Sequence, residues 1–171
     1  MNTKTKKLAF LSVSVALAMI LSFVESQIPP LSAVPGVKIG IANIVTVFLL
    51  YKLGWREACA VSGIRVFLSA LLFGSAVSLF YSFLGAVLSL AVMILAKKLL
   101  PLSPIGVSVL GGVFHNVGQI IAATIVMGSA AIAYYLVPLT VSGTLAGIAV
   151  GVLGGIVATR VNIKKKSKKN K

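Results

Sequence analysis

The chain has 171 residues, of which 58% are hydrophobic and only 11% are charged, and its mean hydropathy is +1.08. A soluble domain of this length needs far more polar surface, so the composition excludes that class and indicates a membrane protein. The net charge of +14 does not indicate a nucleic-acid-binding protein, because the basic residues flank apolar stretches and form no continuous stripe.

Apolar stretches of near-spanning length follow one another along the chain. A helix needs ~20 apolar residues to cross a bilayer, and fewer when polar anchors flank it. Six candidate spans cover residues 8–24, 39–51, 58–73, 76–96, 105–127 and 139–159. The sequence therefore predicts an all-α integral membrane protein, with a single six-helix transmembrane domain over residues 1–160 and a basic tail over residues 161–171.

The first span follows three lysines, as a signal peptide would, but no small-residue cleavage site comes after it, so we expect a retained helix. Its small residues form two ridges, one with Ser14, Ala18 and Ser22 and one with Ser12 and Ala16. Helices in lipid associate through such ridges. Packing inside the bundle is the preferred interpretation, and docking of a partner is the alternative.

The segment between the first two spans, residues 25–40, carries Pro29, Pro30 and Pro35, which prevent a regular helix and stiffen its path. It precedes an unusually short second span. Two interpretations stay open: a rigid outer loop that roofs a cavity, or a plain connector.

The third span places Arg65 in the middle of an apolar run. Ser62 and Ser69 lie one turn away on either side, opposite a face with Val66 and Phe67. Exposing an arginine to lipid near the bilayer centre costs at least ~2.5–3.5 kcal/mol, so we expect this polar strip to face the interior of the bundle.

Further polar residues gather at similar or outer depth. His115 and Gln119 share one face of the fifth span, and Asn116 is adjacent. The second span adds Asn43, while Lys38 and Glu25 lie at the outer rim. One interpretation is a binding pocket for a solute whose carboxylate or phosphate balances Arg65 and Lys38, and the other is a network of interhelical hydrogen bonds without a ligand.

The sixth span and the distribution of charge complete the prediction. Gly143, Gly147, Gly151 and Gly155 recur every four residues and predict close approach of a neighbouring helix. With the N-terminus in the cytoplasm, 14 of the 16 Lys and Arg residues fall on the cytoplasmic side, and only Lys38 falls outside. The positive-inside rule therefore predicts cytoplasmic N- and C-termini.

The sequence lacks the residues that metal binding, nucleotide binding and acid–base catalysis require. One cysteine and one histidine provide no recognisable metal site, and the chain has no Gly-rich loop ending in Lys-Ser or Lys-Thr. Aspartate is absent, and the two glutamates are too far apart for acid–base catalysis. We therefore expect no cofactor and no enzymatic activity of the chain's own.

The stretches "IPPLSAVPGVKIGIANIVTVFLLYKLGWREACAVSGIRVFLSALLFGS" and "GGVFHNVGQIIAATIV" resemble the bacterial membrane family called heptaprenyl diphosphate synthase component I, or the Gx transporter family. The proline loop, the short second helix and the "LG" turn are also similar to substrate-binding S components of energy-coupling-factor vitamin transporters. That resemblance implies an outward-facing pocket, and partners comprising a transmembrane coupling protein and ATPases. It makes Ser12 and Ala16 a docking face for those partners.

The name of the family implies a different function. Prenyl diphosphate synthases hold magnesium and diphosphate with aspartate-rich motifs, because hard divalent cations require carboxylate oxygens. This chain has no aspartate. We predict a multi-pass inner-membrane protein that binds an anionic solute and assists its uptake. The alternative is an accessory membrane subunit of heptaprenyl diphosphate or isoprenoid quinone synthesis.

Overall fold

The computed structural model describes residues 3–28 and 40–161 of the chain. These residues form helices and no strand, in the order α1 (Thr3–Ser26), α2 (Asn43–Lys52), α3 (Trp55–Phe73), α4 (Ala76–Leu99), α5 (Pro104–Met127), the 3-10 helix η1 (Ala130–Tyr135) and α6 (Leu136–Arg160). Each of the six apolar stretches corresponds to one α-helix, so the all-α prediction is confirmed.

Serine and glycine residues between the helices set the ends of α4 and α5. Ser75 precedes α4 and accepts a hydrogen bond from Ser78 N at 3.1 Å. Ser103 does the same for Gly106 N at 3.3 Å at the start of α5, where Pro104 fits because the first turn needs no backbone donor there. Gly128 ends α5 in the left-handed conformation, with φ of 62°.

Four stretches are long and apolar enough to cross a membrane: Lys4–Ser26, Ala76–Leu99, Pro104–Met127 and Ala130–Arg160. The 10 residues of α2 extend only ~15 Å, about half of the hydrocarbon thickness. The 19 residues of α3 include three charged side chains, Arg56, Glu57 and Arg65. By length and composition, four helices thus suit a membrane protein, and α2 and α3 differ from them in length or charge.

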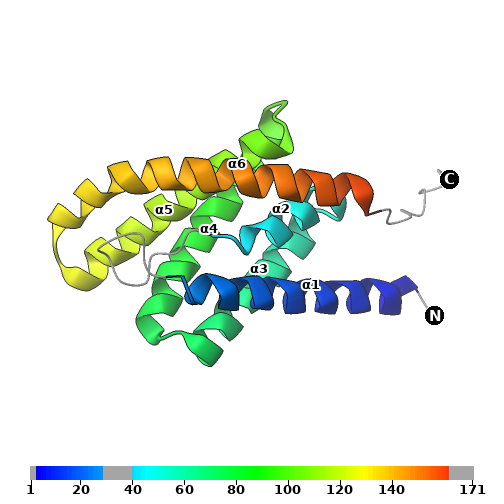
Figure 1. The fold of residues 1–171 in the computed structure, drawn as a ribbon, viewed down its shortest axis with the longest axis horizontal. Coiled ribbons are helices and arrows are strands. Elements are labelled where there is room, and N and C mark those ends of the chain that lie inside the picture. Colours follow the sequence, from blue (N-terminus) through cyan, green and yellow to red (C-terminus); the bar gives the residue numbers. More distant parts are fainter. Residues whose placement is uncertain (1–2, 29–39, 162–171) are drawn as a thin grey trace.

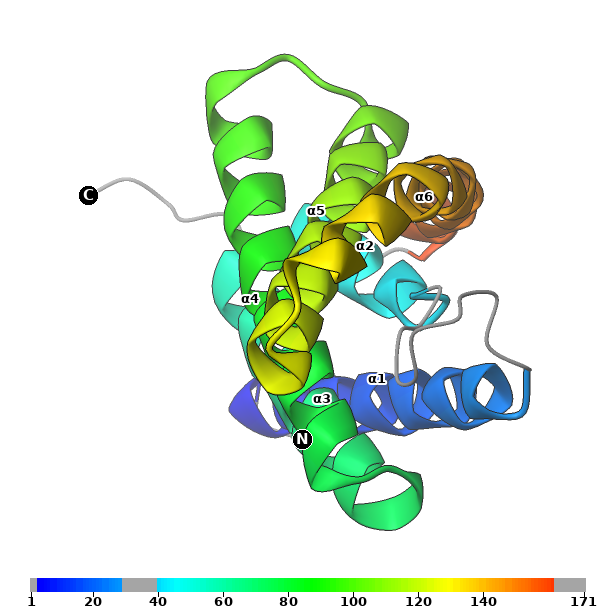
Figure 2. The same cartoon turned by 90° about the vertical axis from the view of Figure 1, so that its left-hand side faces the viewer.

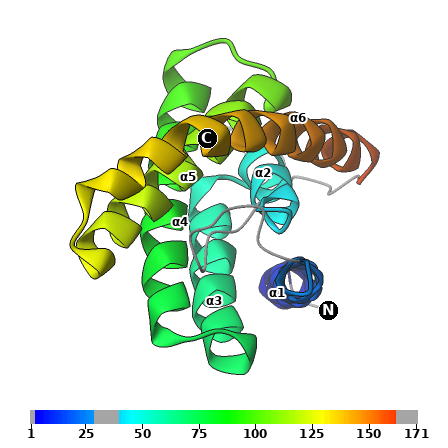
Figure 3. The ribbon, with the colours of Figure 1, turned by 60° about the vertical axis from the view of Figure 1, so that its left-hand side comes forward.

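The helices pack around α2 and α5. Helix α5 lies between α4 and α6, and α1 packs mainly on α3 (Figure 2). Helix α2 lies between α1 and α6 in both Figure 1 and Figure 3. Most α2 side chains are buried, and Leu49 is fully buried. A helix too short to span a membrane is therefore enclosed by longer ones.

The distribution of polarity is the reverse of that in a soluble protein. Large apolar side chains are exposed on the outer faces of the helices, for example Leu8, Leu72 and Val137 at 67%, 70% and 72%. Polar side chains such as Ser62 and Gln119 are buried. Because lipid is as apolar as leucine, this arrangement suits a bilayer and not water.

The glycine ridge on α6 packs directly on the backbone of α5, as the sequence predicts. A Cβ atom at Gly147 would lie 2.6 Å from Val109 Cα, and one at Gly151 would lie 2.6 Å from Ile105 Cα. No side chain fits at those separations. At Gly155 the nearest atom would be Pro104 Cβ at 3.5 Å, an ordinary van der Waals contact. Gly155 lies beside the first residue of α5, so the close backbone contact ends before it.

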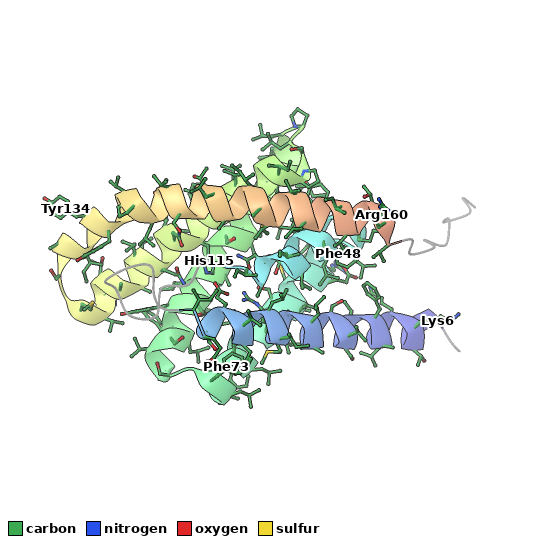
Figure 4. All side chains as sticks on the ribbon, viewed as in Figure 1. Lys6, Phe48, Phe73, His115, Tyr134 and Arg160 are labelled. Atoms are coloured by element: carbon green, nitrogen blue, oxygen red, sulfur yellow. The ribbon has the colours of Figure 1, made fainter. Side chains whose placement is uncertain are left out.

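Basic side chains connect the helix ends on one side of the molecule. Lys7 at the start of α1 pairs with Glu57 at the start of α3. Lys52 at the end of α2 donates a hydrogen bond to Ala158 O of α6 at 2.7 Å. Figure 4 shows Lys6 and Arg160 at this end and Tyr134 at the opposite end. The basic helix ends thus share one face, which we call the basic end.

Candidate functional site

A small polar cavity lies where four helices and Gly40, three residues before α2, converge. Its volume is about 10 Å³, which is room for about one water molecule. The lining comes from α1 (Ser22, Glu25), α3 (Arg65, Val66, Ser69), α4 (Ser82), α5 (His115) and Gly40. Three of the residues predicted from the sequence to bind a solute, Glu25, Arg65 and His115, therefore meet at one place.

Arg65 is the most unusual group in the cavity. Its side chain is 7% exposed, as expected for a charge that must avoid lipid. Nη1 donates to Ser22 Oγ at 3.4 Å, a long hydrogen bond, and Nε is buried without a hydrogen-bond partner among the described residues. Val66 also lines the cavity, so the expectation that it faces away from Arg65 is wrong, whereas Phe67 is exposed as expected.

Glu25 lines the cavity from the last turn of α1, which ends at Ser26. It is 5% exposed. Oε1 accepts a hydrogen bond from Gly40 N, and its charge acts on Arg65 across the cavity. The two side chains form no ion pair within 4.0 Å, since the ion pair found in the described ranges joins Lys7 and Glu57. The guanidinium is thus only partly compensated.

His115 reaches the cavity because α4 provides space for its ring. A Cβ atom at Gly85 would lie 3.0 Å from His115 Cε1 and Nδ1. One turn further, a Cβ at Gly118 would lie 2.7 Å from Leu84 O. The α4 and α5 backbones therefore touch beside the site. Figure 4 places His115 between the basic end and the Tyr134 end of the molecule.

Asn43 and Asn116 lie outside this cavity. Asn43 begins α2 and lines a second cavity of about 10 Å³, which shares Gly40 with the first. Asn116 Nδ2 donates to Leu139 O of α6 at 2.5 Å, next to Gly143. In Asn116 the structure reveals an interhelical hydrogen bond of the kind that stabilises bundles without a ligand.

Gln119 is fully buried, one turn beyond His115 on α5. Neither Oε1 nor Nε2 has a hydrogen-bond partner within the described part of the chain. A buried unpaired amide costs ~1–3 kcal/mol, so such groups are rare unless function requires them. Gln119 does not line the cavity around Arg65.

The remaining predicted residues are less informative. Lys38 falls outside the described residues. Ser12 and Ala16 are exposed on α1, on the side away from the buried Ser14 and Ala18. Ser12 Oγ donates to Leu8 O at 3.1 Å within its own helix. The ridge with Ser12 and Ala16 is thus exposed, and the ridge with Ser14 and Ala18 packs inside.

Sequence reasoning missed Ser82 and Gly40. Ser82, Gly85 and Ser89 recur on one face of α4 and are buried, and this small polar face is a signal that could have identified them. Gly40 adopts φ of +90°, a conformation that favours glycine, and offers its N–H to Glu25. Its role depends on the backbone and could not be inferred from residue type.

The described residues contain no group of three or more His, Cys, Asp or Glu side chains placed to hold a metal ion. The cavity holds one cation, one carboxylate, one imidazole and three serine hydroxyls. This set suits binding through charge and hydrogen bonds.

Comparison with known proteins gives one family. The sequence model of the family described as heptaprenyl diphosphate synthase component I matches residues 14–157. No curated protein and no solved structure matches the chain.

Proposed function

The chain belongs to the heptaprenyl diphosphate synthase component I family. Because "component" in that name denotes one subunit of a complex, we propose that the protein acts with partners as a binding subunit. In this proposal it is a protein of the bacterial inner membrane whose six α-helices form one transmembrane domain, with the short α2 enclosed by the longer helices. It binds a small solute with an anionic group in an outward-facing pocket around Arg65 and assists its uptake.

The charge distribution supports the proposed orientation. The basic end gathers helix-terminal cations from α1, α2, α3, α4 and α6, and Tyr134, which is 84% exposed, lies at the other end. Cytoplasmic loops are enriched in Lys and Arg, and aromatic residues favour membrane interfaces. We therefore assign the basic end to the cytoplasm. In this orientation α3 crosses with α2 beside it, and Arg65 is shielded from lipid.

The incomplete pairing of Arg65 is the observation that carries the proposal. A structural arginine is expected to have its donors satisfied by carboxylates or carbonyls. Arg65 instead has one long bond to Ser22, an unpartnered Nε and a carboxylate beyond ion-pair distance. A carboxylate or phosphate of a solute would accept the remaining donors, and Ser69, Ser82 and His115 would orient it.

Binding requires the cavity to widen, because its 10 Å³ accommodates only about one water molecule. The hydrogen bond from Gly40 N to Glu25 suggests how the cavity could widen when a solute binds. Glu25 is a negative charge of the protein facing Arg65, so an anionic solute would compete with it. Once Glu25 is displaced, its bond to Gly40 is lost, and the start of α2 is released from the end of α1.

The energy for uptake would come from partners or an ion gradient, because the sequence has no nucleotide-binding loop. The exposed ridge with Ser12 and Ala16 supports docking of an energy-coupling membrane protein and its ATPases, since small residues permit close helix approach.

A direct test is to purify the protein from its native membrane in mild detergent and identify both the proteins and the small molecules that accompany it. The proposal predicts an anionic solute, together with a membrane coupling protein and ATPases. Absence of any anionic small molecule would contradict solute binding.

The name of the family favours a second candidate, an accessory membrane subunit of heptaprenyl diphosphate or isoprenoid quinone synthesis. The chain has no aspartate, so it would support a catalytic partner and would not itself hold the diphosphate through magnesium. Co-purification of a soluble prenyltransferase, without ATPases, would favour this candidate over the importer.

A further inference from the structure

A larger hollow lies away from the Arg65 cavity, between the start of α5 and the end of α6. Its volume is about 340 Å³, which is comparable to that of small-molecule sites at ~300–1,000 Å³. Its walls are mainly apolar and include Ile105 from α5 and Val152 and Ile156 from α6. These three side chains are 39–52% exposed, so the hollow is an open groove on the outer surface of the bundle.

The groove lies where α5 begins beside the glycines of α6. At Gly151 the helices are in backbone contact, and one turn later, at Gly155, the nearest α5 atom is a side-chain carbon of Pro104. The space beside Gly155 therefore remains empty of side chains. A leucine at position 155 would place its Cβ at ordinary contact distance from Pro104, and the rest of its side chain would extend into the groove.

The end of the groove is electropositive. Thr159 belongs to its lining and Arg160 is the next residue, exposed at the end of α6. Lys52 binds Ala158 O, which brings a second cation to the same helix end. The first turn of α5 adds the positive end of its helix dipole. No acidic residue belongs to the described lining of the groove.

We infer that this groove is a binding site for an anionic phospholipid, with an acyl chain along Ile105, Gly155 and Ile156 and the headgroup phosphate at Arg160. Two features favour this occupant. An apolar groove on the lipid-facing side of a membrane protein is filled by hydrocarbon chains, and the basic end matches a negatively charged headgroup. The site is separate from the Arg65 cavity, so it does not depend on the proposed uptake function.

The test uses the full-length protein, delipidated in detergent, with phosphatidylglycerol and phosphatidylcholine of identical acyl chains as probes in native mass spectrometry. Wild-type protein is expected to bind phosphatidylglycerol in preference. Arg160→Gln should weaken phosphatidylglycerol binding about fivefold and leave phosphatidylcholine unchanged. Lys6→Gln, which removes an exposed cation on α1 at the same end, is the matched control and should have little effect.

The groove itself is tested by Gly155→Leu, which should lower binding of both lipids. Ala149→Leu adds the same side chain at an exposed α6 position outside the groove and should leave binding unchanged. Equal binding of the two lipids by wild-type protein would overturn the inference. An Arg160→Gln protein that binds like wild type would also overturn it, and this exposed substitution does not depend on whether Gly155→Leu folds. Preference for a polyprenyl phosphate over phosphatidylglycerol would reject a phospholipid as the occupant.

Discussion

Adding one methyl group at Gly151 tests whether α5 and α6 are in backbone contact. The new Cβ would lie 2.6 Å from Ile105 Cα and 3.0 Å from Ser108 Cβ. Non-bonded carbons pack at ~3.5–4.0 Å, so the helices must separate by about 1 Å. Such overpacking costs ~1–3 kcal/mol, and the better helix propensity of alanine returns only ~0.5–1 kcal/mol. Gly151→Ala should therefore lower the free energy of unfolding by up to ~2 kcal/mol.

Gly155→Ala is the matched control on the same helix face. Its Cβ would meet Pro104 Cβ at 3.5 Å, an ordinary contact, so this variant should be as stable as wild type or more stable by ~0.5–1 kcal/mol. Both variants can be compared with wild type by equilibrium unfolding in mixed micelles, followed by far-UV circular dichroism. Equal effects of the two substitutions would refute the inferred helix contact, because Gly151 faces the α5 backbone at 2.6 Å and Gly155 does not.

Three further predictions concern the site, the packing and the orientation. Glu25→Gln removes the negative charge that faces Arg65, so an anionic solute should be retained more strongly on purification; unchanged or weaker retention would argue against competition between solute and carboxylate. Asn116→Leu removes the interhelical hydrogen bond and leaves Leu139 O only its bond within α6, so it should lower the stability by ~0.5–1.5 kcal/mol in a detergent melt, and an unaltered melt would show that the bond is dispensable. In a background without the native cysteine, Ser129→Cys should react with an impermeant maleimide in intact cells and Ser103→Cys only after permeabilisation, and the opposite pattern would reverse the assigned orientation.

The sequence was sufficient to predict the helices because their limits follow from local chemistry. Apolar runs of spanning length predict the long helices. Ser75 and Ser103 are typical N-cap residues before α4 and α5, and Gly128 is a typical C-cap residue after α5. The short second span was also evident from its length. The sequence alone could not establish that this segment is enclosed by α1, α3 and α6, since that depends on how distant helices pack.

The site was predicted in part, for a similar reason. Burial of Arg65 follows from the high cost of exposing a charge to lipid, and His115 joins the polar group because it shares a helix face with Gln119. The partners of Glu25 and Asn116 were not predicted, because Gly40 N and Leu139 O are backbone groups whose positions depend on helix rotation and on crossing points. A single residue of rotation exchanges a cavity-facing position for one that faces a neighbouring helix, as Asn116 beside His115 demonstrates.

The most direct test of the proposed function compares the small molecules retained by wild type, Arg65→Ala and Arg56→Ala. Arg56 is exposed at the start of the same helix and stacks on Trp55, so its removal controls for loss of a positive charge. Removing a buried charged partner costs ~2–5 kcal/mol of binding free energy. We predict that wild type and Arg56→Ala retain the same anionic solute and that Arg65→Ala, with its helical content intact, loses it. Retention of that solute by Arg65→Ala at the wild-type level would contradict the account.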